Sequence, residues 1–403
     1  MMLPRLTLFG RSLVLMSTLF AANAVCWIVA GLLFGRNSDG SLLSLALLAW
    51  TLGLRHALDA DHISAIDNAT RGLINMGQLP VTCGLFFSLG HSTIVIVVNV
   101  AIAISTSIYD KLDGVGTVGG IVGAAVSGSF LFIVGLANSI ILWRIIRKRQ
   151  RAQRRAEQNL PPDDESDDPK ENHTLMLRIL GPVITFVNKP WKMYPVGVLF
   201  GFGFDTASSI ALLAISALAR KRSDGSAIPS GYIVILPLLF TAGMTIIDSA
   251  DSVLMLYSYS GFPERTWAII EVPPTLTDDA AHHLHPDTGE SVDLHLSTDV
   301  ARDQRVKTNV MSGLSIILTL MSIFVAFSIS LITIMGLIGE QCARCQAAAN
   351  APDGGGLAGK WWRGWANAND KSGFIGAAIV GSFVVVVACW YGGRRLLSAR
   401  RAR

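Results

Sequence analysis

The chain has 403 residues, of which 51% are hydrophobic and only 15% are charged. Soluble proteins carry about 25% charged residues, so this composition excludes an ordinary soluble enzyme and indicates a membrane protein. The net charge of +4 does not indicate a nucleic-acid partner, because the basic residues cluster at the ends of apolar runs.

The apolar runs predict an all-α, polytopic membrane protein with a single membrane domain over residues 1–403. A spanning helix needs about 20 predominantly apolar residues, and each run is close to that length. Eight spans are predicted, at residues 12–34, 43–66, 80–104, 119–143, 194–218, 231–257, 311–337 and 373–393.

The first apolar run also imitates a signal peptide. Two basic residues, Arg5 and Arg11, come just before it. Within it, Ala22-Asn23-Ala24 resembles a cleavage site. The run continues to Phe34, which is longer than the apolar core of a signal peptide. We therefore interpret it as a retained first span.

The distribution of Lys and Arg predicts the orientation, because cytoplasmic loops carry an excess of these residues. Seven basic residues lie between Arg144 and Arg155, after the fourth span, and five more follow the eighth span. With eight spans, both termini are expected in the cytoplasm. The stretch Arg220-Lys221-Arg222, after the fifth span, opposes this orientation.

Two long cytoplasmic loops are predicted. Residues 144–193 begin basic and then turn acidic, a pattern typical of a disordered linker. Residues 258–309 form the second loop, which holds half of the chain's histidines. Capture of metal ions and an ordinary polar loop both remain open for it. Its histidines are His282, His283, His285 and His295.

An extracellular loop is predicted at residues 338–372, where Cys342 and Cys345 form a CxxC pair. A local disulfide, half of a metal site and two separate thiols are all compatible with this spacing. The pattern alone does not decide between them.

The second span carries ionisable residues in the stretch RHALDADHISAIDNATR, residues 55–71. Each such residue costs at least ~2.5–3.5 kcal/mol at the centre of a spanning helix, so it indicates a function. At 100° per residue, His56, Asp59 and His62 follow one side of a continuous helix. We predict a divalent-metal site from His56, Asp59, Asp61 and His62.

A buried salt-bridge network is the structural alternative for these charges. It describes Arg55, Asp67 and Arg71 best, and we interpret those three as structural ion pairs. It does not explain the two histidines, because an amide side chain would serve a purely structural network as well.

Polar residues in three further spans extend the predicted site into a pathway. His91 of the third span is predicted as a fifth metal ligand. The remaining pathway residues lie in the fifth and sixth spans, and they are Asp205, Ser208, Ser209, Asp248 and Asp251.

Imidazole and carboxylate ligands suit Ni²⁺, Co²⁺, Zn²⁺ or Mn²⁺ rather than Cu⁺. The residues therefore predict a divalent-cation transporter whose ion is the substrate, with no resident cofactor. Export and transport in an organelle remain open, because ligands do not encode direction. A membrane metalloenzyme is a weaker alternative, since no H-E-x-x-H motif is present.

Four motifs in order resemble the nickel/cobalt transporter family of eight-helix permeases, in its fungal form. The stretch R-H-A-x-D-A-D-H-I begins at Arg55, and L-G-H-S-T occupies Leu89–Thr93. G-F-D-T-A occupies Gly203–Ala207, and Gly243-Met244 precedes the two aspartates of the sixth span. Together these motifs cover residues 55–255.

The resemblance implies a multi-pass secondary transporter that takes up Ni²⁺, and in many members Co²⁺, across the plasma membrane. A nickel enzyme such as urease is then the indirect beneficiary. One departure matters: many members continue G-F-D-T-A with Thr-Glu, whereas this chain has Ser208-Ser209. Any role that this glutamate has in ion coupling in those members therefore cannot be assigned to this chain.

Overall fold

The computed structural model is helical, and it describes residues 6–35, 41–104, 107–158, 187–202, 229–260, 269–270, 313–352 and 354–401. Within these ranges no strand is formed, and a single isolated bridge joins Leu6 to Ile270. The helices are α1 (Leu8–Phe34), α2 (Ser41–His56), α3 (Ala60–Asn75), α4 (Cys83–Ile104), α5 (Ser107–Glu157), α7 (Met193–Gly201), α9 (Ile235–Ser260), α11 (Gly313–Gln341), α12 (Ala343–Ala349), α13 (Gly356–Asp370) and α14 (Ser372–Arg401).

Six helices in the described part of the chain are long and apolar enough to cross a membrane. They are α1, α4, α5, α9, α11 and α14, and the bent pair α2–α3 would be a seventh span. The predicted all-α, polytopic membrane protein is confirmed to this extent. The predicted span 194–218 begins in α7 and then continues outside the described residues.

The predicted second span is not one continuous helix. It ends as α2 at His56 and resumes as α3 at Ala60, with a bend of 52° between the halves. Asp59 is in an extended conformation. Asp61 lies in the first turn of α3, where its Oδ1 accepts the backbone N–H of His62 at 3.0 Å. A carboxylate in that position is stabilised by the partial positive charge of the helix N-terminus.

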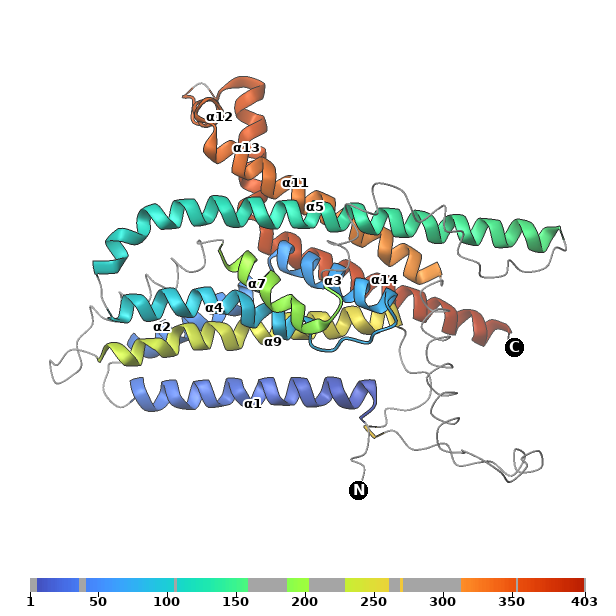
Figure 1. Cartoon of the computed structure of the whole chain (residues 1–403), viewed down its shortest axis with the longest axis horizontal. Coiled ribbons are helices and arrows are strands. Elements are labelled where there is room, and N and C mark those ends of the chain that lie inside the picture. Colours follow the sequence, from blue (N-terminus) through green and yellow to red (C-terminus); the bar gives the residue numbers. More distant parts are fainter. Residues whose placement is uncertain are drawn as a thin grey trace.

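The spans run alongside one another, and α4 packs against both α7 and α9 (Figure 1). Backbones approach closely at two of these contacts. Gly90 of α4 and Gly197 of α7 face each other's helix so tightly that a Cβ on either would overlap a carbonyl oxygen. Gly84 of α4 lies in the same way against the backbone of Asp248 in α9. These contacts hold α4, α7 and α9 together.

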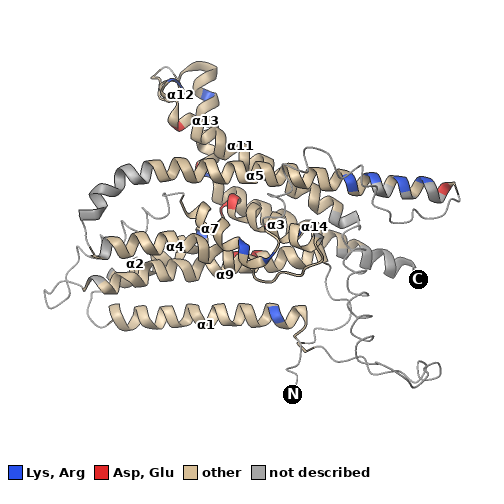
Figure 2. Ribbon diagram, viewed as in Figure 1, with Lys and Arg blue, Asp and Glu red and all other residues tan. Residues whose placement is uncertain are grey.

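The basic residues after the fourth span belong to a helix rather than to the start of a linker. The stretch Arg144–Arg155 continues α5 as far as Glu157. Figure 2 shows these charges gathered at one end of α5, while most of the bundle carries none. Helix α5 therefore extends beyond the predicted boundary at residue 144, and residues 159–186 of the predicted linker lie outside the described residues. The His-containing loop lies mostly outside the described residues.

The predicted loop 338–372 is largely helical, because it contains α12 and α13. The two helices project sideways from the bundle (Figure 1). A disulfide joins Cys342, the N-cap of α12, to Cys345 in the first turn of that helix, which decides among the alternatives for this pair.

Candidate metal centre

Three histidines from three helices converge inside the bundle. His56 ends α2, His62 lies in the first turn of α3, and His91 lies in the middle of α4. One ring nitrogen from each falls within 4.8 Å of the other two. The Nε2 atoms of His56 and His91 are 3.0 Å apart. His62 and His91 are buried, and His56 is partly buried.

The break between α2 and α3 is what brings His56 and His62 together. In a continuous helix, six residues would separate them by about 9 Å of axial rise. The observed ring centroids are 4.6 Å apart. The predicted proximity is therefore present, but the predicted helical register that was to produce it is wrong.

Carboxylates lie behind two of the three rings. Asp59 Oδ2 is 2.9 Å from Nδ1 of His56, and Asp248 Oδ2 is 3.4 Å from Nδ1 of His62. Ser88 donates a 2.5 Å hydrogen bond to the same Asp248 oxygen. A carboxylate facing Nδ1 favours the proton there and leaves the Nε2 lone pair for a metal.

The spacing of the nitrogens fits a common metal ion. Two imidazole nitrogens bound at about 2.1 Å and at right angles would be about 3.0 Å apart. That is the separation of the His56 and His91 Nε2 atoms. Two nitrogens that both approach with lone pairs repel, so this arrangement needs either a shared proton or a cation between them. The three imidazoles therefore form a donor set that could hold a divalent cation.

Residues 42–265, more than half of the chain, match the family model NicO, described as high-affinity nickel-transport protein. The chain belongs to the NicO family. Membership makes it a nickel transporter and not an enzyme. No solved structure matches the chain.

Relatives of this NicO chain carry names that agree with the family. It is 53% identical to the high-affinity nickel transport protein of Cryptococcus neoformans var. grubii, over 98% of this chain and 92% of that one. It is 41% identical to the high-affinity nickel transport protein of Cupriavidus necator, over 62% of this chain and 69% of that one. It is 40% identical to the cobalt transport protein NhlF of Rhodococcus rhodochrous, over 55% and 62%.

The last helix of this NicO chain supports the site from behind, which sequence reasoning missed. Ser372 donates a 3.2 Å hydrogen bond to Oδ1 of Asp59. Gly376 lies directly against the carbonyl oxygen of Leu58, where a Cβ would overlap it. In the sequence, only the small residues at the start of α14 pointed to this contact. They do not indicate a role at the site by themselves, because small residues are common in packed spanning helices.

A second buried polar network lies along α3. Ser322 Oγ donates to Asp67 and accepts a 2.9 Å hydrogen bond from Arg71, which also donates to Asn68 at 2.7 Å. Among the described residues, Asp67 and Arg71 make no direct ion pair and meet instead through Ser322. Arg55 is exposed, and its side chain pairs with no described residue. Asp67 and Arg71, two of the three residues predicted to form structural ion pairs, are thus joined through a hydroxyl, and Arg55 lies outside this network.

The other predicted pathway residues divide into two groups. Asp251 is 7% exposed, and neither of its carboxylate oxygens has a hydrogen-bond partner in the described part of the chain. It lies one helical turn beyond Asp248 on α9. Asp205, Ser208 and Ser209 lie outside the described residues.

Proposed function

We propose that the chain takes up Ni²⁺, with Co²⁺ as a second substrate, by secondary transport through the three-histidine site. The observation that carries the proposal is the convergence of His56, His62 and His91 within 4.8 Å inside a bundle of apolar helices. The names of the relatives support nickel as the first substrate and cobalt as the second.

The ion exchanges part of its hydration shell for the three imidazoles. Asp59 and Asp248 hold His56 and His62 in the tautomer that presents a lone pair, and they add negative charge near the ion. Asp61, at the start of α3, adds a further carboxylate beside the break. Asp251 is the next group along α9 that can receive the ion, since neither of its oxygens has a hydrogen-bond partner among the residues that the structure describes.

The break in the second span is itself suited to this role. Discontinuous helices in transporters place helix ends and unpaired backbone groups at the ion site. Here α2 ends at His56, beside the site, and the partial negative charge at this helix C-terminus favours a cation. We include Asp205, Ser208 and Ser209 in the pathway on the strength of the sequence alone.

For the topology we propose eight spans in the plasma membrane, with both termini in the cytoplasm. The basic end of α5 supports this orientation. The Cys342–Cys345 disulfide supports an extracellular position for the segment between α11 and α14, because disulfides persist in oxidising compartments. The segment 258–309 is then cytoplasmic.

The membrane potential alone can drive uptake. A divalent cation that enters a negative interior gains about 2 × 2.3 kcal/mol per 100 mV, so a co-transported proton is not required. The imported ion would serve an intracellular nickel enzyme such as urease.

Radioactive nickel uptake into cells that express the full chain tests the proposal. We expect His56→Ala, His62→Ala and His91→Ala each to abolish uptake at equal expression. Thr93→Val is the matched control on α4, because its hydroxyl contacts Leu89 and Tyr194 rather than the site. Uptake that persists in the histidine variants would contradict the proposed site. Net loss of preloaded nickel would identify an exporter.

A further inference from the structure

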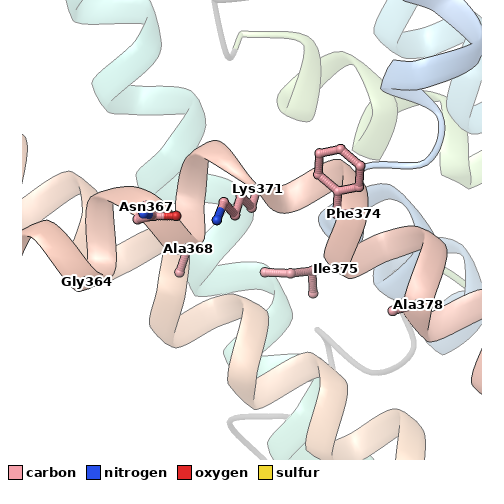
Figure 3. A pocket seen from close by; sticks show the side chains of 7 residues that line it. All are labelled: Gly364, Asn367, Ala368, Lys371, Phe374, Ile375 and Ala378. Atoms are coloured by element: carbon pink, nitrogen blue, oxygen red, sulfur yellow. The ribbon is translucent and has the colours of Figure 1, made fainter.

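A surface groove of about 480 Å³ lies where α13 meets α14. Its lining is almost entirely apolar and includes Ala368, Phe374, Ile375 and Ala378 (Figure 3). The one charged residue in the lining is Lys371. Its ammonium group is exposed and contacts no acidic side chain among the described residues. The groove thus combines an unpaired cation with an apolar channel.

The neighbouring helix α13 has an inner and an outer side. On the inner side it packs on α11, where the ring of Trp362 lies against Gly339. The outer side is largely apolar: Leu357 is 89% exposed and Trp361 is 56% exposed. An exposed face of this kind needs a partner.

The chain connectivity limits where this apolar face can lie. The segment that contains α12 and α13 joins two spans, α11 and α14, so it emerges at a membrane surface. Figure 1 shows it projecting sideways from the bundle, across the direction in which the spans run. A helix in that position lies along the bilayer surface rather than across the bilayer. Tryptophan is enriched at this depth, because its ring is apolar and its N–H is polar.

We propose that α13 lies in the headgroup layer and that the groove beside it binds a phospholipid. The phosphate pairs with Lys371, and one acyl chain follows Phe374, Ile375 and Ala378 along α14. Trp361 and Leu357 enter the same leaflet next to the bound lipid. The groove has a cation at one end and an apolar lining that continues along a spanning helix. A phospholipid matches it in both charge and shape.

The test uses the purified full-length chain in detergent, with lipid binding measured by native mass spectrometry. Phosphatidylglycerol, diacylglycerol and inorganic phosphate are titrated separately. We expect Lys371→Glu to weaken phosphatidylglycerol binding at one site about tenfold, because an ion pair is replaced by repulsion. Lys189→Glu is the matched charge reversal, since Lys189 is exposed and precedes the turn Pro190–Lys192, which packs on α4 and α7 and does not line the groove, and it should leave binding unchanged.

Two further variants keep the proposal testable if Lys371→Glu does not fold. Lys371→Gln removes the charge without reversing it, and Ile375→Trp fills the channel; each should weaken phosphatidylglycerol binding. Equal binding of diacylglycerol would overturn the role of Lys371, and equal binding of inorganic phosphate would overturn the role of the channel. A mass shift from dimer to monomer in Lys371→Glu would identify a second copy, not a lipid, as the occupant.

Discussion

Ser372 donates its hydroxyl hydrogen to Oδ1 of Asp59, a residue 313 positions earlier in the chain, at a distance of 3.2 Å. The other oxygen of Asp59 faces Nδ1 of His56. The first residue of α14 is therefore connected to the metal centre through a single carboxylate. The orientation of His56 depends on a helix that contributes no metal ligand of its own.

Removal of this hydroxyl should weaken the site without abolishing it. In Ser372→Ala, Asp59 loses one hydrogen bond to a charged group, which is worth roughly 1 kcal/mol at a partly exposed position. We expect the apparent KM for nickel uptake to rise about fivefold, with little change in maximal rate. Ser382→Ala is the control on the same helix, because that hydroxyl bonds only to Ile379. Equal effects of the two variants would contradict the connection.

The contact between α14 and the break should not tolerate a methyl group at Gly376. Because a Cβ there would overlap the carbonyl oxygen of Leu58, Gly376→Ala must displace either α14 or the segment that carries Asp59. We expect nickel uptake to be lost or reduced at least tenfold. Gly381→Ala should be neutral, since among the described residues no atom outside its own stretch of α14 lies within 4 Å of the position of its Cβ. Uptake and the yield of folded protein in detergent, measured on both variants, would distinguish a damaged site from a misfolded chain.

Asp248 should act through His62 rather than as an isolated charge. Loss of an outer carboxylate behind a metal-binding histidine costs about 10–100-fold in affinity, so Asp248→Asn should raise the apparent KM within that range. Ser88→Ala should have a smaller effect in the same direction, because its hydroxyl only supports Asp248. Ser258→Ala, whose hydroxyl bonds back to Leu254 in α9, serves as the control. A larger effect of Ser88→Ala than of Asp248→Asn would reverse the proposed order of contacts.

Uptake should decline as the external pH falls. A protonated imidazole has no lone pair for a metal, so binding is complete when the three histidines are neutral and is lost as they take up protons. Initial rates of nickel uptake, measured from pH 8 to pH 5 at a clamped membrane potential, test this. Rates that rise toward acidic pH would instead indicate that a proton enters together with the ion.

The sequence was informative wherever a polar residue stood in an apolar setting. His56, His62 and His91 could be found because an intramembrane histidine is costly and therefore rare. The break after His56 could not be predicted, since hydrophobic residues continue on both sides of it and Asp59 and Asp61 are equally compatible with a continuous helix. Ser372 was hidden for a different reason: its partner is distant in the chain, and a serine at a helix start is ordinary.

The glycine contacts of α4 and α14 divide the centre into two packed units, one around His91 and Asp248 and one around the break after His56. Gly84 and Gly90 hold α4 to its neighbours, so His91 and Asp248 should stay in register throughout a transport cycle. The residues between His56 and Ala60 form a turn, in which the backbone N–H of Ala57 bonds to Gly53, that of Leu58 to Arg55 and that of Asp59 to His56. If the ion leaves by a movement of one unit past the other, we expect the break and the start of α14 to move together, because Gly376 lies against Leu58 and Ser372 bonds to Asp59.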